Sequence, residues 1–235
     1  MSSLRQDPPF PFLALLGASA IVLACVTGIS LDHSVALEAY FGNVPPVLAA
    51  ILVCSVGTAA LYVLHTRLSF FVYVPGTSRR GWLAAVVLAF PFMLSIALID
   101  TLFRFPMDIN VPLPTALIFY LAMGYVAQMA LHVAPLAVLL SIGNVLFSSG
   151  TGRQLIWISF VLVATLETVF QVRVSLAGGD PAALTAFVAA HLFLFGLVEL
   201  WLFRRFDYVS MYLFRMVYYG FWHLTWGTLR LQWLF

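Results

Sequence analysis

The sequence predicts an all-α fold, a polytopic transmembrane helical bundle of roughly seven or eight helices. The chain has 235 residues, of which 63% are hydrophobic and 9% charged, whereas soluble proteins carry about 25% charged residues. The net charge of +2 is too small for a surface that follows nucleic-acid phosphates, so we expect no nucleic-acid partner. Because about 20 apolar residues cross a bilayer, the helices fill the chain. We therefore expect a single integral membrane domain over residues 1–235, with membrane lipids around it.

The first three spans are expected at about residues 11–29, 45–65 and 82–103. Between the second and third spans, a loop carries Arg67, Arg79 and Arg80. Positive residues mark cytoplasmic loops, and Arg5 places the N-terminus on the same side. The sequence therefore predicts a cytoplasmic N-terminus in a bacterial inner (plasma) membrane.

The next segment, residues 111–147, has 37 residues without a formal charge. As one helix it would be about 55 Å long, nearly twice the membrane thickness. Proline removes a hydrogen bond and disfavours helix in the preceding residue, so a break is expected between His132 and Pro135. One broken crossing would put Arg153 and the Arg204-Arg205 pair inside, with the better charge balance; two short crossings would put them outside. At the level of sequence, both arrangements stay open.

The last three spans, at about 154–174, 181–203 and 209–231, contain most of the ionisable residues that lie inside apolar helices. A charge at the bilayer centre costs about 2.5–3.5 kcal/mol, so each one implies a partner or a task. We expect Glu199 and Arg215 to form an ion pair between adjacent helices. The polar-site helices are therefore placed within residues 154–235.

Two further polar groups lie outside that region. Asp100 and Arg104 are four residues apart at the end of a span. This spacing favours a pair on one helix face, and the alternative is that both side chains meet the membrane interface. His132, close to Pro135, is expected to cap backbone carbonyls that the proline frees.

Spacing relates the polar residues of the last spans to one another. Glu167 and Gln171 lie four residues apart, as do Phe187 and His191, and Arg215, Tyr219 and His223 follow at the same interval. Residues four apart share a helix face, so one carboxylate and two imidazoles can converge and activate a water by general base catalysis. The predicted catalytic residues are Glu167, His191 and His223, and the predicted binding residues are Gln171, Phe187, Glu199, Arg215 and Tyr219.

Glu167 in an apolar helix, then Phe187-Val-Ala-Ala-His191, then His223 after Tyr218-Tyr219-Gly-Phe-Trp222 resemble the CAAX-protease and bacteriocin-processing family of intramembrane proteases, also called CPBP or Abi. The resemblance covers about residues 158–235. It implies a helical bundle with a glutamate-dependent peptidase site that opens within the membrane. By this analogy Glu167 and His191 would position and deprotonate a water, and His223 would stabilise the oxyanion.

The chain departs from the family pattern at the supporting positions. Members have a double Glu followed by Arg, and an Asn or Asp four residues after the last His. Here the residue before Glu167 is Leu166, the matching Arg position is Gln171, and the residue four after His223 is Gly227. If Glu167 is instead the first of the pair, Thr168 follows it and Val172 takes the Arg position. The resemblance thus implies either an active peptidase or a degenerate relative.

Other functions remain open from the sequence. A non-enzymatic membrane subunit, such as a scaffold, an assembly factor or a small transporter, would bind a partner membrane protein in place of a peptide or protein substrate. Haem ligation by His191 and His223 is a further hypothesis. One Glu with two His could also make a zinc site, but the resemblance argues against a metal, so no metal and no cofactor are expected.

Overall fold

The computed structural model describes residues 11–32, 37, 41–71, 78–147, 152–179 and 181–235. These residues form helices and no strand, which confirms the predicted all-α class. The α-helices are α1 (Phe12–Asp32), α3 (Pro46–Thr66), α4 (Ser78–Phe103), α5 (Thr115–Gln128), α6 (Ala134–Phe147), α7 (Arg153–Gly178), α8 (Ala182–Arg205), α9 (Tyr208–Tyr219) and α10 (Gly227–Trp233). Two π-helices, η1 (Met129–Val133) and η2 (Gly220–Trp226), connect α5 to α6 and α9 to α10.

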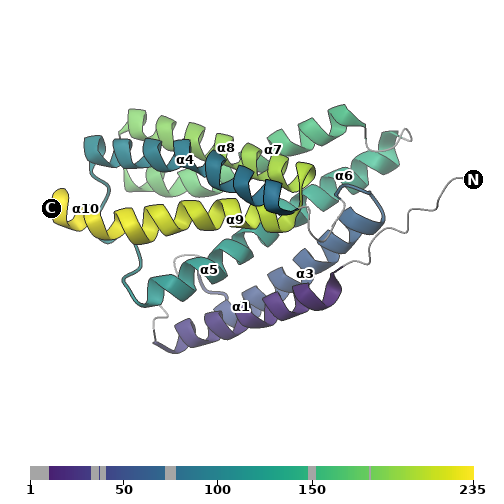
Figure 1. Cartoon of the computed structure of the whole chain (residues 1–235), viewed down its shortest axis with the longest axis horizontal. Coiled ribbons are helices and arrows are strands. Elements are labelled where there is room, and N and C mark those ends of the chain that lie inside the picture. The colour runs from purple at the N-terminus through teal and green to yellow at the C-terminus, as the bar shows by residue number, and fades with distance from the viewer. Residues whose placement is uncertain (1–10, 33–36, 38–40, 72–77, 148–151, 180) are drawn as a thin grey trace, which may run out of the picture.

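Six helical segments of the described chain are long and apolar enough to cross a membrane. The run from α9 through η2 to α10 adds a seventh helical segment, so the arrangement agrees with the predicted count. Consecutive runs alternate in direction, and α1 begins at the end of the bundle opposite to the one where α10 ends (Figure 1).

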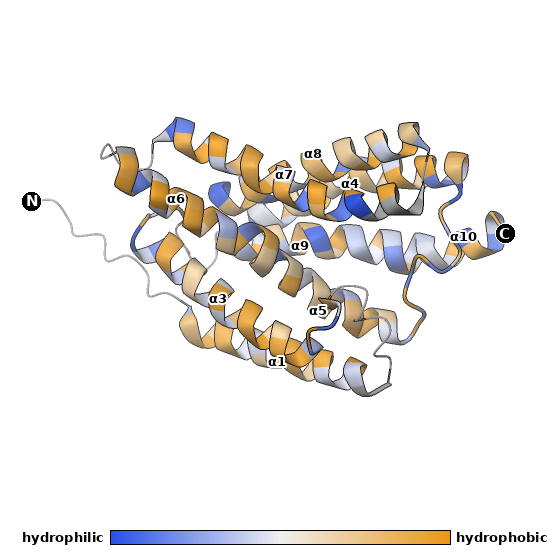
Figure 2. Cartoon of the chain, turned by 180° about the vertical axis from the view of Figure 1, so that it is seen from behind, coloured by the Kyte–Doolittle hydropathy of each residue, from blue (hydrophilic) through white to orange (hydrophobic). Residues whose placement is uncertain are grey.

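The surface of the bundle is apolar, unlike that of a soluble protein. Large hydrophobic side chains on α4, such as Leu83, Phe90 and Leu98, are exposed, and the outward faces of α1, α3 and α6 are mainly hydrophobic (Figure 2). Buried positions include charged residues. This distribution is consistent with an integral membrane protein, in which lipid covers the apolar surface.

The uncharged segment forms one continuous run, α5–η1–α6, and its apolar part from Thr115 to Leu146 is a single span of 32 residues. The predicted break between His132 and Pro135 is a π-helix instead. Here the Ala134 backbone N–H donates to the Met129 carbonyl, five residues back. The wider turn lets the helix continue past a proline that cannot donate its own hydrogen bond. Of the two arrangements left open by the sequence, this continuous run favours the single crossing.

Small residues bring the helices close together around the middle of the bundle. A Cβ atom on Gly196 of α8 would lie 3.4 Å from the Ala164 backbone of α7. On α3, a Cβ atom on Gly57 would lie within 2.6 Å of the Met129 sulfur of η1. Such close approaches are typical of membrane helix packing, and they bring α8 close to α7 and α3 close to η1.

Asp100 pairs with Arg230 of α10, so the predicted pair with Arg104 is wrong. The Arg230 guanidinium donates two hydrogen bonds to the Asp100 carboxylate, at 2.6 and 2.8 Å, and Trp226 Nε1 donates a third at 2.8 Å. Helix α4 ends before Arg104, whose backbone has a positive φ of 51°. The four-residue spacing therefore does not place the two side chains on one helix face.

We expect Asp100→Ala to lower the free energy of unfolding by about 3–5 kcal/mol, because it leaves Arg230 as an uncompensated buried charge. Thermal unfolding of the purified protein in detergent, followed by tryptophan fluorescence, measures this loss. The exposed carboxylate of Asp108 supplies the control Asp108→Ala, which should change stability by less than about 0.5 kcal/mol. Equal effects of the two substitutions would contradict a stabilising role for the Asp100–Arg230 pair.

Candidate functional site

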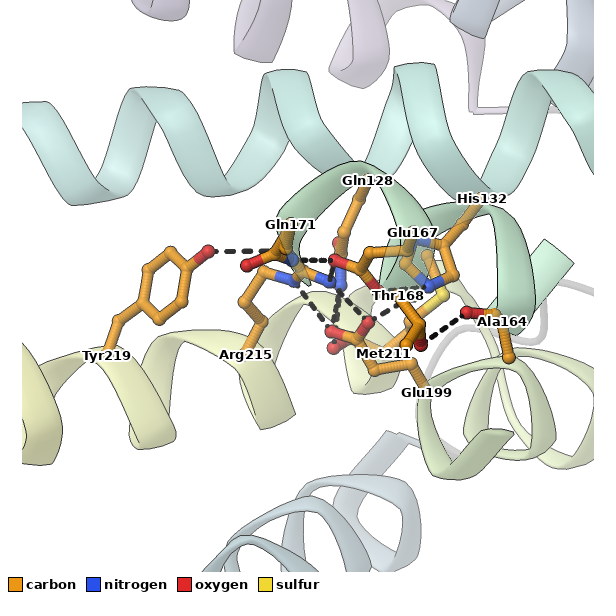
Figure 3. Close-up of polar contacts among 10 residues, drawn as sticks. All are labelled: Gln128, His132, Ala164, Glu167, Thr168, Gln171, Glu199, Met211, Arg215 and Tyr219. Atoms are coloured by element: carbon orange, nitrogen blue, oxygen red, sulfur yellow. Dashed lines mark hydrogen bonds and ion pairs between the residues drawn. The ribbon is translucent and has the colours of Figure 1, made fainter. Parts of the chain in front are cut away.

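Four ionisable side chains meet in the interior of the bundle, and we call them the polar cluster: His132 of η1, Glu167 of α7, Glu199 of α8 and Arg215 of α9 (Figure 3). Their exposed fractions are 0%, 1%, 0% and 1%. A group of charges inside a membrane bundle marks a candidate functional site, because each charge there is costly unless it is paired.

Arg215 bridges the two carboxylates. Its Nε and Nη2 atoms donate to Glu199 Oε1 and Oε2 at 2.8 and 2.6 Å. Nη2 also donates to Glu167 Oε1 at 2.7 Å. The predicted ion pair between Glu199 and Arg215 is therefore confirmed, and its two parallel hydrogen bonds use the planar fork of the guanidinium.

Amide and hydroxyl groups complete the hydrogen bonds of the bridge. Gln128 Nε2 donates to Glu199 Oε1 at 2.9 Å and to the Met211 carbonyl at 3.1 Å. Gln171 Nε2 donates to Glu167 Oε1 at 3.0 Å, and Arg215 Nη1 donates to the Tyr219 hydroxyl at 3.2 Å. The predicted binding residues Gln171 and Tyr219 thus join the predicted Glu199 and Arg215, whereas Gln128 was missed by sequence reasoning.

His132 completes the polar cluster and does not act as the predicted carbonyl cap. Its Nε2 lies 3.1 Å from Glu167 Oε2 and 3.3 Å from Glu199 Oε2. Neither contact has the geometry of a hydrogen bond, and among the described residues both nitrogens of His132 and Glu167 Oε2 are buried without a hydrogen-bond partner. A sequence signal existed, because Gln128 and His132 lie four residues apart in a segment otherwise free of charge.

The structure gives the two predicted catalytic histidines, His191 and His223, partners outside the polar cluster. His191 lies between Ser95 and Tyr218, with its Nδ1 3.2 Å from the Ser95 hydroxyl and its Nε2 3.1 Å from the Tyr218 hydroxyl. The ring of Phe187, a predicted binding residue, packs against His191 at 5.5 Å. No hydrogen bond or ion pair joins either His191 or His223 to Glu167 in the described part of the chain, and their catalytic roles stay predictions.

His223 of η2 contacts residues from the α4–α5 connection and α5. Its Nδ1 lies 2.6 Å from Asn110 Oδ1, and its ring stacks on Tyr120 with centroids 3.8 Å apart. A Cβ atom on Gly227 would lie 2.7 Å from Asn110 Nδ2. The Asn110 amide therefore occupies the space next to His223 that a side chain at position 227 would need.

The polar cluster also groups possible metal ligands. One donor atom from each of His132, Glu167 and Glu199 lies within 4.8 Å of the others. An imidazole and two carboxylates can hold a divalent cation or act as a general base. No family model, curated protein or solved structure matches the chain, so the chemistry is inferred from the side chains themselves.

We expect Arg215→Ala to lower the free energy of unfolding by about 3–5 kcal/mol, since it leaves two buried carboxylates without their cation. Arg215→Lys should recover only part of this loss, because an ammonium cannot reproduce the two parallel hydrogen bonds. Thermal unfolding in detergent measures both. The control is Arg173→Ala on the exposed face of α7, and an Arg215→Ala protein as stable as this control would contradict the bridging role.

Proposed function

We propose that the protein is an intramembrane peptidase of the CAAX-protease/Abi type, or a degenerate relative, that cleaves a membrane-associated peptide or protein. The observation that carries the proposal is the facing pair of Glu167 Oε2 and His132 Nε2, 3.1 Å apart and buried within the helical bundle. A carboxylate next to an imidazole is a unit that can take a proton from water.

Hydrogen bonds orient the reactive carboxylate. Arg215 and Gln171 both donate to Glu167 Oε1, so that oxygen is occupied and Oε2 remains without a donor. A water bound to Oε2 and to His132 Nε2 would lose its proton to this pair and attack the peptide carbonyl. In this mechanism His132 takes the imidazole role that the family resemblance assigned to His191.

An apolar cavity offers room for a substrate near the polar cluster. It has a volume of about 360 Å³ and lies among α1, α3, α5 and α9, with Tyr125 and Tyr212 in its wall. Tyr125 lies three residues before Gln128 on α5, which donates a hydrogen bond to the polar cluster. Tyr212 lies three residues before Arg215 on α9, which belongs to the cluster. Because the polar cluster itself is almost fully buried, a peptide from this cavity would reach Glu167 only when these helices separate.

A second candidate is a non-enzymatic membrane subunit that binds a partner membrane protein. The observation in its favour is that Arg215 already pairs with both carboxylates, which suits a polar core that only holds helices together. Purification of the protein in mild detergent separates the two functions. A stoichiometric partner without any peptide cleavage would support this second function.

The arginines suggest an orientation in a bacterial inner membrane, with the N-terminus in the cytoplasm. The helix ends and connections on the side of the bundle where α1 begins carry Arg67, Arg79, Arg80, Arg153, Arg204 and Arg205, and those on the opposite side carry Arg104, Arg173 and Arg230. Positive residues accumulate on the cytoplasmic side. The end with more arginines is therefore assigned to the cytoplasm.

Accessible cysteines test this orientation. In a background with Cys25→Ala and Cys54→Ala, we expect a membrane-impermeant maleimide to label Asp108→Cys in intact cells. Arg79→Cys should react only after the membrane is opened, because its end of α4 faces the cytoplasm. The reverse labelling pattern would contradict the proposed orientation.

Substitutions in the facing pair test the peptidase function. We expect Glu167→Gln and His132→Ala to lower cleavage by about 10²–10⁴-fold, the usual contribution of general base catalysis. The measurement is mass spectrometry of labelled protein N-termini in membranes of cells that express each variant, with His65→Ala as a control imidazole outside the polar cluster.

New N-termini should appear with the wild-type and His65→Ala proteins and not with the two cluster variants. Cleavage that persists in Glu167→Gln would refute the peptidase function. Cleavage that persists in His132→Ala but disappears in His191→Ala would return the imidazole role to His191.

A further inference from the structure

We propose that the polar cluster is a binding site for a divalent cation, zinc being the best match, with His132 Nε2, Glu167 Oε2 and Glu199 Oε2 as ligands. The binding site stands on its own geometry, while its role in activating a water rests on the proposed peptidase function. It departs from the expectation of no metal that the family resemblance implied.

The spacing of the donor atoms fits a metal polyhedron. In a tetrahedral zinc site, bonds of about 2.0–2.1 Å place neighbouring ligand atoms about 3.3 Å apart. His132 Nε2 lies 3.1 and 3.3 Å from the two carboxylate oxygens. Each of the two contacts therefore already has the length of a tetrahedral edge, and the third donor pair lies within 4.8 Å.

The contacts of His132 Nε2 with the two carboxylates have ion-pair distances but not the alignment of hydrogen bonds. His132 Nε2 and Glu167 Oε2 are buried and have no hydrogen-bond partner among the described residues. If Nε2 carried a proton, its N–H would align with neither oxygen. A lone pair directed between the two carboxylates instead matches what a cation needs, and the cation would satisfy polar atoms that are costly to leave unpaired.

The charges of the cluster sum to zero when a cation and a hydroxide are bound. When His132 is neutral, as a metal ligand must be, two carboxylates and Arg215 leave one negative charge in the interior of the bundle. A divalent cation with one coordinated hydroxide cancels it. Three protein ligands and a fourth, open position are the arrangement of catalytic zinc sites, in which the metal lowers the pKa of its bound water to about 7.

Arg215 is compatible with such a site. Its Nη2 donates to Glu199 Oε2 at 2.6 Å, but a carboxylate oxygen has a second lone pair that can face the metal. On Glu167 the guanidinium uses Oε1, which leaves Oε2 free. Arg215 then acts as the outer partner that orients both ligand carboxylates, a common role for groups behind metal ligands.

Metal content of the purified full-length protein tests the site. After removal of metals with a chelator and incubation with zinc alone, we expect about one zinc per chain, measured by mass spectrometry. Cobalt in its place should give the visible absorption of a tetrahedral complex. His132→Ala and Glu199→Gln should each weaken zinc binding at least about 100-fold, whereas the matched control His191→Ala, which removes another buried imidazole, should keep one zinc.

Thermal unfolding of the wild-type protein gives a test of zinc binding that does not depend on whether the variants fold. Zinc should raise the midpoint temperature, because a ligand that binds only the folded state stabilises it, and His191→Ala should respond equally. Zinc content well below one per chain, or zinc binding unaffected by His132→Ala and Glu199→Gln, would overturn the proposal. Zinc bound without any peptide cleavage would instead refute the proposed function alone, and His132-dependent cleavage by zinc-free protein would refute the role of the metal in activating a water.

Discussion

The bridge that Arg215 makes between Glu167 and Glu199 is the interaction on which the interior of the protein depends. A single guanidinium satisfies two carboxylates from two other helices, so α7, α8 and α9 must keep one register. In water such a pair contributes little, but an unpaired charge in the membrane interior is far more costly. The bridge therefore constrains the bundle chiefly because its loss would leave unpaired charges in the membrane interior.

The π-helix η1 supplies the fourth side chain of the polar cluster, His132. Its five-residue hydrogen bond from Ala134 to Met129 widens the turn that holds His132, one turn before Pro135 would interrupt an ordinary α-helix. The widened turn packs against α3, where Gly57 leaves room for Met129. The same local feature thus lets the span continue past a proline and directs an imidazole at the two carboxylates. π-helices are frequent at functional sites.

The helical fold and part of the site could be predicted from the sequence, because they depend on local composition. Apolar length places the spans, and the cost of buried charge points to the Glu199–Arg215 pair. Contacts between helices were harder to predict: Asp100 pairs with Arg230, 130 residues away, because α4 ends before Arg104. His132 was expected to cap carbonyls of its own helix, since its four-residue spacing from Gln128 shows a shared helix face but not that η1 turns this face toward α7. His191 and His223 each lie four residues after another predicted site residue of the same helical segment. Neither forms a hydrogen bond or an ion pair with Glu167 in the described part of the chain.

The atoms of His132 and Glu167 that lack hydrogen bonds favour a site that takes a ligand over a core that only joins helices. A hydrogen bond between membrane helices contributes about 0.6 kcal/mol on average, whereas a buried polar atom without a partner costs about 1–3 kcal/mol. Two such atoms 3.1 Å apart would thus offset more stability than several of the neighbouring hydrogen bonds provide. A water or a cation bound between them would remove that cost. The buried His132 and Glu167 atoms therefore cost less free energy in a site with a bound ligand than in a core that only packs helices.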